Sequence, residues 1–127
     1  INNFSKFLEN FSSLKVPKVY GELTTDQTIT MSFLEGQELS SVVNFNQSKK
    51  DKISLSLIEL LFNEIFNFKF VQTDPNLANF LVSKDDNSIS VLDFGACCRV
   101  SDETYKLYKG LLKVSLTLDV EKVKLFL

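Results

Sequence analysis

The sequence has no long apolar run, no basic run and no cysteines spaced for a bridge. None of its 127 residues belongs to a stretch that approaches the roughly 18 apolar residues of a membrane-spanning helix. Its 14 lysines and arginines and 16 aspartates and glutamates give a formal net charge of −2, and no basic cluster could follow a phosphate backbone. The sequence therefore predicts neither a transmembrane segment nor a nucleic-acid partner.

Cysteine is scarce as well, because the only two cysteines are the adjacent Cys97 and Cys98. Neighbouring cysteines are badly placed to bridge one another, and they do not match the spacing of a zinc site. This usage is compatible with a reducing compartment. The chain also lacks internal repeats and Gly/Ser-rich linkers. We therefore expect one domain or part of one, which at this length buries roughly two-thirds of its unfolded surface.

Residues 71–96 contain the pattern that points to chemistry. Asp74 is followed five residues later by Asn79, and Asp93-Phe94-Gly95 comes after two apolar stretches around a polar turn. Phosphoryl transfer needs an oxygen base near the nucleophile and hard oxygen ligands for Mg²⁺. Asp74 is the candidate catalytic base, and Asn79 and Asp93 are the candidate metal ligands. The alternative is that Asp74-Pro75-Asn76 is only a turn and Asp93-Phe94-Gly95 only a strand end, because turns favour Asp, Pro, Asn and Gly.

The pattern resembles that of the UbiB-type atypical kinases, and their mitochondrial branch in particular. The matching residues are Gln72-Thr73-Asp74-Pro75-Asn76, Asn79-Phe80, Leu92-Asp93-Phe94-Gly95-Ala96, Val16-Pro17-x-Val19-Tyr20 and Thr30-Met31. In this family Gln-Thr-Asp-Pro-Asn stands in place of the His-Arg-Asp-Leu-Lys of ordinary protein kinases. The resemblance covers most of the chain.

This resemblance implies ATP and Mg²⁺ as cofactors, and ATP binding with slow hydrolysis in support of coenzyme Q (ubiquinone) biosynthesis. It implies coenzyme Q precursor lipids and other coenzyme Q biosynthesis proteins as partners. It also implies a location on the matrix side of the mitochondrial inner membrane. Asn76 occupies the position where ordinary protein kinases have a lysine that steadies the γ-phosphate. That difference argues against transfer to a protein hydroxyl.

Apolar periodicity predicts the elements before this motif. A helix within residues 1–14 is predicted from the stripe Phe4, Leu8, Phe11 and Leu14. Residues 16–23 and 28–34 predict two strands of a hairpin that turns at residues 24–27, and Thr28, Ile29 and Thr30 supply β-branched side chains.

The second half of the chain is predicted in the same way. Residues 48–69 predict a largely buried helix capped by Ser48. Residues 80–82 and 89–92 flank a turn-rich tetrad and predict a short hairpin. An amphipathic helix is expected to begin after Ser101, and Asp119 is expected to cap a last helix.

The predicted fold class is α+β, a protein-kinase-like fold with a mostly helical C-lobe and a terminal β-hairpin of the N-lobe. Residues 1–34 would end the N-lobe with the hinge, and residues 35–127 would form the C-lobe. Met31 would then be the gatekeeper, although ordinary core packing is the alternative for this residue. The expected nucleotide-binding residues are Met31, Ser32, Phe33, Leu34 and Asn76.

A working kinase site also needs a phosphate-binding loop and a strand lysine paired with a helix glutamate. None of these is found in the 127 residues, which do not begin with Met. Three hypotheses follow: part of a UbiB-type kinase or ATPase, a pseudokinase-like binding module without turnover, or an α+β domain whose motif is coincidental. The first predicts that Asp74, Asn79 and Asp93 converge on one cleft, with Asn79 and Asp93 oxygens roughly 4 Å apart around Mg²⁺.

Overall fold

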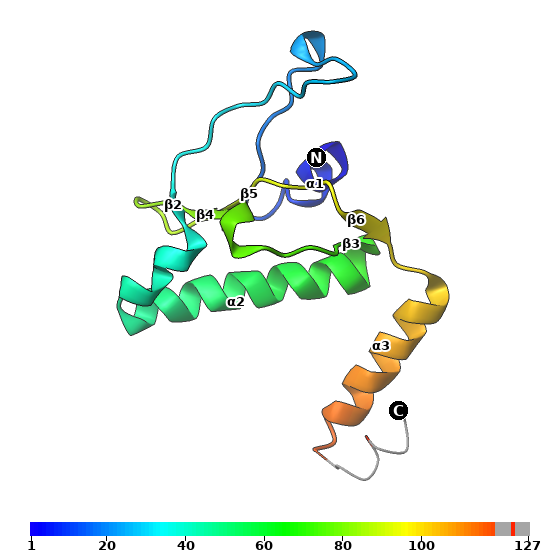
Figure 1. Cartoon of the computed structure of the whole chain (residues 1–127). Coiled ribbons are helices and arrows are strands. Elements are labelled where there is room, and N and C mark those ends of the chain that lie inside the picture. Colours follow the sequence, from blue (N-terminus) through cyan, green and yellow to red (C-terminus); the bar gives the residue numbers. More distant parts are fainter. Residues whose placement is uncertain (119–122, 124–127) are drawn as a thin grey trace.

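A computed structural model describes residues 1–118 and residue 123. The helices are α1 (Asn2–Phe7), α2 (Gln47–Asn63) and α3 (Asp102–Ser115), with 3-10 segments η1 (Gly21–Leu23), η2 (Leu39–Asn44) and η4 (Leu77–Asn79) and the π-helical η3 (Glu64–Phe68). The strands are β1 (Leu14–Lys15), β2 (Gln37–Glu38), β3 (Phe70–Gln72), β4 (Phe80–Val82), β5 (Ile89–Val91) and β6 (Cys97–Arg99). α2 runs along one side of the strands, and α3 leads away from them (Figure 1).

The strands form two small sheets. Four of them make one sheet in the order β1-β5-β4-β2, and β3 pairs with β6 in the other. β4 and β5 are antiparallel, with Phe80 opposite Val91, which confirms the hairpin predicted from residues 80–92. β1 runs parallel to β5, and β2 runs antiparallel to β4. The predicted hairpin is therefore the centre of the larger sheet.

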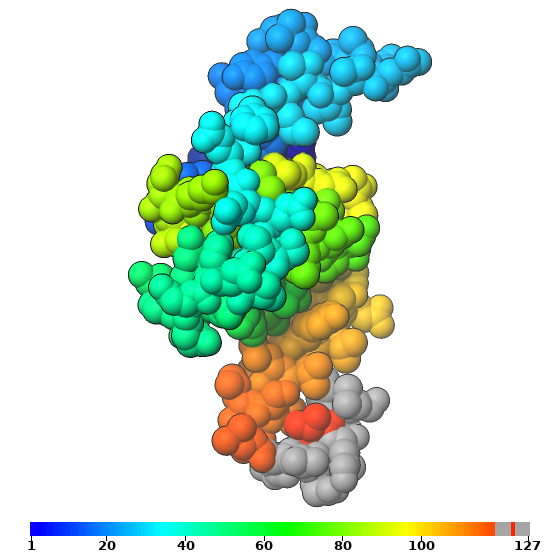
Figure 2. Space-filling view, turned by 60° about the vertical axis from the view of Figure 1, so that its left-hand side comes forward, coloured from blue at the N-terminus to red at the C-terminus, as the bar shows by residue number. Residues whose placement is uncertain are grey.

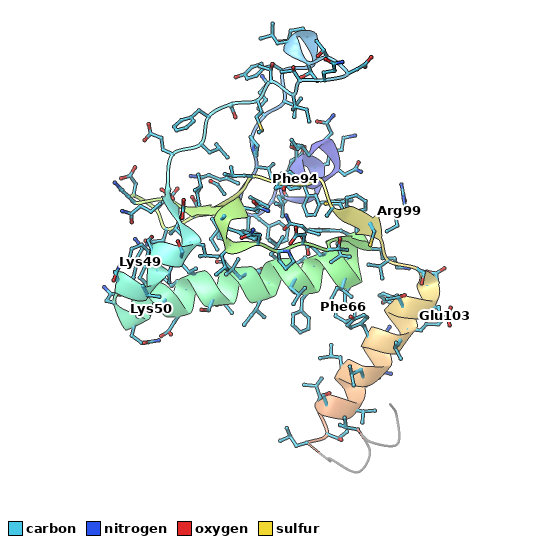
Figure 3. All side chains as sticks on the ribbon, viewed as in Figure 1. Lys49, Lys50, Phe66, Phe94, Arg99 and Glu103 are labelled. Carbon is cyan, nitrogen blue, oxygen red and sulfur yellow. The ribbon has the colours of Figure 1, made fainter. Side chains whose placement is uncertain are left out.

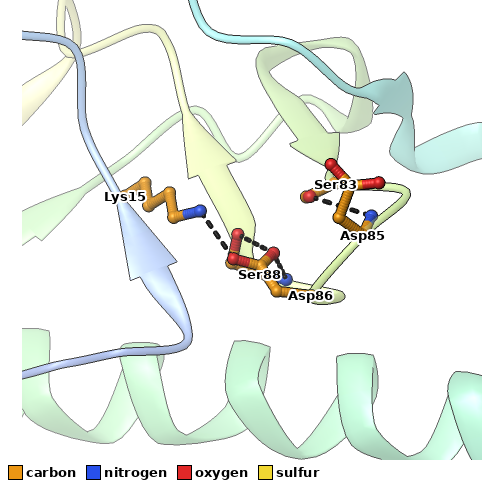
Figure 4. Close-up of polar contacts among 5 residues, drawn as sticks. All are labelled: Lys15, Ser83, Asp85, Asp86 and Ser88. Carbon is orange, nitrogen blue, oxygen red and sulfur yellow. Dashed lines mark hydrogen bonds and ion pairs between the residues drawn. The ribbon is translucent and has the colours of Figure 1, made fainter.

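Polar side chains hold the tip of this hairpin and join it to β1 (Figure 4). Asp86 Oδ1 accepts hydrogen bonds from the Ser88 backbone N–H at 3.0 Å and the Ser88 hydroxyl at 2.7 Å. Lys15 Nζ lies 2.7 Å from Asp86 Oδ2. The Lys15 ammonium and then the Ser88 donors hold the pKa of the Asp86 carboxyl well below its usual range.

The core lies where α1, α2 and the larger sheet meet. Its buried apolar residues are Phe4, Leu8, Leu14, Leu39, Ile53, Leu60, Phe80, Val82, Ile89 and Val91. α1 is shorter than the helix predicted within residues 1–14, because the chain must become extended at Leu14 to pair with β5. Phe4, Leu8 and Leu14 are buried all the same. The apolar stripe predicted burial correctly and helix length wrongly.

α2 begins at a different cap from the predicted one. Asn46 rather than Ser48 caps the helix, because Asn46 Oδ1 accepts the Lys49 N–H at 2.9 Å. The helix continues through η3 and ends at Lys69, whose φ of 49° is left-handed.

The prediction that this helix is largely buried is wrong for its α2 part. Ile53 and Leu60 are buried against the core, but the opposite side is open. Exposed apolar residues on α2 are Leu55, Ile58, Leu61 and Phe62. The reason is that α2 packs against the strands with one face, and α3 contacts the η3 segment beyond it.

The N-terminal hairpin forms only in part. The Tyr20 N–H donates to the Thr30 carbonyl at 2.9 Å, next to an antiparallel bridge between Val19 and Met31. Continuous strands over 16–23 and 28–34 do not form. Residues 21–23 are a 3-10 turn, and the Thr24 and Thr30 hydroxyls bond the backbone in place of a strand ladder. Figure 2 shows this hairpin projecting from one end of the molecule and α3 from the other.

α3 confirms the helix predicted after Ser101, whose Oγ accepts the Thr104 N–H at 3.0 Å. Phe66 points from η3 toward α3, and its ring lies 6.0 Å from that of Tyr105 (Figure 3). The helix expected after Asp119 lies outside the described residues. In residues 1–118, no helix is long and apolar enough to cross a membrane.

Candidate functional site

Two side chains at the end of β3 bind the backbone of the Asp-Phe-Gly segment. Gln72 Nε2 donates a hydrogen bond to the Asp93 carbonyl. Thr73 donates both its backbone N–H and its hydroxyl to the Ala96 carbonyl, each at 2.7 Å. Gln72 stands opposite Cys97 in the β3–β6 pair, so the bonds from Thr73 to Ala96 continue this strand pairing by one residue into the motif. The two halves of the motif are therefore held side by side.

The Asp-Phe-Gly segment itself is fixed by one ring and one turn. Phe94 points toward α1, and its ring lies 4.9 Å from that of Phe4 (Figure 3). Asp93 Oδ1 accepts the Gly95 N–H at 2.8 Å. The packed ring anchors the segment in the core while Asp93 stays exposed.

Asn79 and Asp93 face one another at the open end of the β4–β5 hairpin. The Leu92 N–H donates to the Asn79 carbonyl at 2.9 Å, and Asn79 Nδ2 lies 3.5 Å from Asp93 Oδ2. The two ends of an amide are alike in size, so a half-turn of the Asn79 amide presents its oxygen instead. The structure brings these two residues together, and their role as metal ligands stays a prediction.

The donor set at this position suits a cation that arrives with a nucleotide. Among the described residues, no three His, Cys, Asp or Glu side chains are grouped as a metal site. A carboxylate and an amide oxygen are hard ligands that fit Mg²⁺, which keeps waters or takes phosphate oxygens as its other ligands.

Asp74 and Asn76 lie in the loop between β3 and η4 and are placed differently. Asp74 is exposed, and within residues 1–118 its carboxylate has no hydrogen-bond partner, so it is free to orient a water or a hydroxyl. Asn76 Oδ1 accepts the Ala78 N–H at 3.0 Å and caps η4. The Asn76 side chain thus shapes the loop, and its contact with a nucleotide stays a prediction.

The side chains of the four expected hinge residues do not all face one cavity. Met31 lines a cavity of about 260 Å³ with Ile1, Ile29, Leu92, Asp93, Phe94 and Gly95. Ser32 Oγ instead accepts the Lys18 N–H at 2.9 Å, and Phe33 is 86% exposed beside another cavity. Leu34 is half-buried. Met31 is 43% exposed, which disfavours the core-packing alternative and places it near the Asp-Phe-Gly segment.

Comparison with known proteins identifies the family. The family model described as "ABC1 atypical kinase-like domain" matches residues 1–127. Over 112 residues the chain is 38% identical to "Atypical kinase COQ8, mitochondrial" of Saccharomyces cerevisiae, and the match covers 88% of this chain and 22% of that protein. Over 124 residues it is 34% identical to "Probable serine/threonine-protein kinase abkA" of Dictyostelium discoideum, covering 96% of this chain and 21% of that protein. The chain belongs to the ABC1 atypical kinase-like family.

The fold of this ABC1 domain is shared with a solved structure. The complex of Rv3197 with erythromycin from Mycobacterium tuberculosis matches with a TM-score of 0.76 over 98% of this chain and 32% of that one, at 16% identity. This likeness concerns the fold, and it confirms the predicted kinase-like α+β class. The chain spans about a fifth of the length of the curated relatives that it matches. The division at residues 34 and 35 stays a prediction.

The ABC1 domain also contains a buried carboxyl that sequence reasoning missed. Glu64, the first residue of η3, is 5% exposed. Burial raises the pKa of Glu64 to about 7, and a hydrogen bond from the Gln72 backbone offsets part of that rise. Spacing is the signal that could have found it. Glu64 follows Leu60 and Leu57 by four and seven residues, so it lies on the apolar face of the helix.

Proposed function

We propose that this ABC1 domain binds Mg²⁺-ATP as part of a UbiB-type atypical kinase or ATPase. The observation that supports it is the pair Asn79 and Asp93, whose side chains lie 3.5 Å apart beside a cavity that Asp93 shares with Met31. Asn79 and Asp93 would hold Mg²⁺, which when bound offsets the charge of the nucleotide phosphates.

Asp74 would orient the attacking hydroxyl or water. Its loop is fixed on one side by the two bonds from Thr73 to the Ala96 carbonyl and on the other by the Asn76 cap on η4. Met31 would contact the adenine side of the nucleotide, and Phe33 and Leu34 would offer backbone groups. The Ser32 N–H already donates to the Lys18 carbonyl at 2.8 Å, so Ser32 would offer only its carbonyl. Because the Asn76 amide carries no charge and is engaged within the loop, we favour hydrolysis over transfer to a protein hydroxyl.

The biological setting is proposed from the relatives. The yeast relative is named a mitochondrial atypical kinase COQ8, and so is a Danio rerio COQ8B that is 37% identical over 94 residues, 74% of this chain and 15% of that protein. We therefore propose a role in coenzyme Q biosynthesis on the matrix side of the mitochondrial inner membrane. Coenzyme Q precursor lipids and other coenzyme Q biosynthesis proteins are the proposed partners.

One observation favours a second candidate, a pseudokinase-like binding module. No Lys or Arg side chain is among the described residues that line the cavity beside Asp93. A site without a cation from the protein loses part of the stabilisation of the transferred phosphoryl group. Steady ATP hydrolysis by the full-length protein would exclude this candidate.

The substitution Asp93→Asn in the full-length protein tests the proposal. It replaces an anionic ligand by a neutral one, so we expect Mg²⁺-ATP to bind about tenfold or more weakly, a loss of about 1.4 kcal/mol. Binding of metal-free ATP should change by less than about twofold, because the carboxylate then has no cation to hold. Titration calorimetry measures both.

The matched control is Asp26→Asn, which makes the same chemical change at an exposed position in the turn of the N-terminal hairpin. Its two affinities should equal those of the unmodified protein. An equal loss of metal-free and Mg²⁺-ATP binding in Asp93→Asn would show that Asp93 is not the metal ligand.

A further inference from the structure

A buried carboxyl lies in apolar surroundings beside the loop of residues 73–76 between β3 and η4, which contains Asp74 (the catalytic loop). Glu64 faces a cavity of about 230 Å³ whose described lining residues are otherwise apolar except for Gln72. The apolar lining residues are Leu39, Leu57, Leu60, Leu61, Pro75, Leu77 and Phe80. Pro75 belongs to the loop that contains Asp74, and Leu77 is the first residue of η4, which follows this loop. Burying a carboxyl costs free energy unless it has a hydrogen-bond partner, so Glu64 is expected to have a partner in this cavity.

Glu64 is connected to Asp93 through a single residue. Glu64 and Gln72 are both buried and line the same cavity, where a hydrogen bond from the Gln72 backbone lowers the pKa of the Glu64 carboxyl. The Gln72 side chain donates to the Asp93 carbonyl. Gln72 is itself buried, at 8% exposed, so water does not compete for these bonds. The helix, the catalytic loop and the Asp-Phe-Gly segment therefore meet at Gln72.

The local backbone is also unusual where this connection begins. α2 changes from α-helical to π-helical hydrogen bonding at Glu64, and such bulges are frequent at functional sites. The π-helical segment ends at Phe68, the left-handed Lys69 turns the chain into β3, and Gln72 is the last residue of that strand. Glu64 and Gln72 are thus set by the same piece of backbone.

We infer that Glu64 is a positioning residue for nucleotide binding, which acts through Gln72 to hold Asp93 in place. The effect on nucleotide affinity rests on the proposed function. The connection from Glu64 through Gln72 to Asp93 rests on geometry alone and can be tested without nucleotide. Glu64 does not touch the nucleotide or the cation. Its carboxylate fixes the Gln72 backbone, and Gln72 fixes the backbone of the metal ligand.

The ionisation of Glu64 gives the connection a measurable signature. A carboxylate accepts a backbone N–H more strongly than a neutral carboxyl does. Burial raises the pKa of Glu64 to about 7, so both forms are populated near neutrality. Of the described residues that line the cavity, from η2, α2, η3, β3, the catalytic loop and β4, Glu64 alone is titratable, and Cys97 on β6 is the further group that its charge affects.

The first experiment needs no nucleotide. In the full-length protein labelled with 15N-glutamine, the Gln72 side-chain amide signals should shift with pH around a midpoint of about 7. Glu64→Gln keeps an acceptor but cannot titrate, so this shift should vanish. The control Glu59→Gln changes an exposed carboxylate on α2 and should leave the shift in place. A shift that persists in Glu64→Gln, or that is absent from the unmodified protein, would overturn the inference.

The second experiment measures nucleotide affinity. Glu64→Leu removes the acceptor, so Mg²⁺-ATP should bind about tenfold more weakly while metal-free ATP changes by less than about twofold. Glu64→Gln should restore Mg²⁺-ATP binding to within about threefold of the unmodified protein, because its amide oxygen still accepts the Gln72 N–H. Equal affinities for all three proteins would contradict a positioning role.

The two experiments distinguish a failure of this inference from a failure of folding and from a failure of the proposed function. If Glu64→Leu does not fold, the Gln72 signals in Glu64→Gln still decide. If the unmodified protein binds no Mg²⁺-ATP, the proposed function fails, and the nucleotide-free experiment alone accepts or rejects the connection from Glu64 to Gln72.

Discussion

At the scale of single residues, Glu64 links stability to pH. Its pKa rises from 4.5 to about 7 on folding because burial disfavours the charged form. The folded state therefore holds a proton that the unfolded state has released between these two values. The stabilisation from this proton is complete below about pH 4.5 and is lost as pH rises through about 7.

We predict that Glu64→Gln gains stability relative to the unmodified protein as pH increases from 5 to 8. The gain can reach about 3 kcal/mol, since each pKa unit corresponds to about 1.4 kcal/mol. Urea unfolding of both proteins at each pH measures it. The exposed Glu59→Gln serves as the control and should show no such trend. A stability difference that is constant across this range would mean that Glu64 keeps one charge state throughout.

At the scale of elements, the approach of the hinge segment to the sheet depends on Gly36. A Cβ at this position would lie 2.8 Å from Leu81 Cβ and 3.1 Å from the Val82 carbonyl oxygen. Neither atom can rotate away, because both belong to the backbone or lie next to it in β4. Gly36→Ala would therefore push β2 away from β4, where Gln37 stands opposite Val82.

We predict that Gly36→Ala destabilises the fold by about 1–3 kcal/mol, the usual cost of overpacking. The midpoint of chemical denaturation reports the loss. Gly21→Ala is the matched control, because a Cβ there meets no atom within 4 Å, and it should change stability by less than about 0.5 kcal/mol. If the two substitutions have the same effect, close packing at Gly36 is not what limits the sheet.

Elements whose signals are local could be predicted from the sequence. The β4–β5 hairpin follows from two apolar runs around a polar turn, and α3 follows from Ser101 and the acidic residues after it. The β3–β6 pair was not predictable in this way, because residues 70–72 and 97–99 are separated by the whole β4–β5 hairpin and are not joined by one turn. The cap of α2 was misplaced because Asn46 and Ser48 are both good caps, and only the structure shows which side chain accepts an N–H.

In the candidate site too, local signals could be predicted from the sequence and long-range packing could not. Spacing alone predicted Asp74, Asn79 and Asp93, because the motif lies within one hairpin and its flanks. The directions of Ser32 and Phe33 depend on how the N-terminal hairpin pairs and packs, which no local pattern encodes. Spacing puts Glu64 on the apolar face of its helix, but the cavity that it shares with Gln72 depends on how the loop packs there, which no local pattern encodes.

At the scale of the whole molecule, the cavity proposed for the nucleotide is small and its edge is open. The cavity beside Asp93 has a volume of about 260 Å³, which is below the roughly 300–1,000 Å³ of most ligand pockets. Met31 at its edge is 43% exposed and Phe33 is 86% exposed, so bound adenine would keep much of its surface in water. Little apolar burial is then available to offset the loss of freedom on binding.

We predict that residues 1–127 alone bind Mg²⁺-ATP with a Kd of about 1 mM or weaker, which corresponds to about −4 kcal/mol. A kinase-like site also uses a phosphate-binding loop and a strand lysine, so a full-length protein that supplies them should bind far more tightly. Titration calorimetry on both proteins decides this, with Asp93→Asn in each as the control for binding through the metal ligand. If residues 1–127 bind with micromolar affinity and Asp93→Asn abolishes that binding, the exposed cavity suffices and enclosure adds little. If they bind with micromolar affinity that Asp93→Asn leaves unchanged, the nucleotide occupies a different surface of the domain.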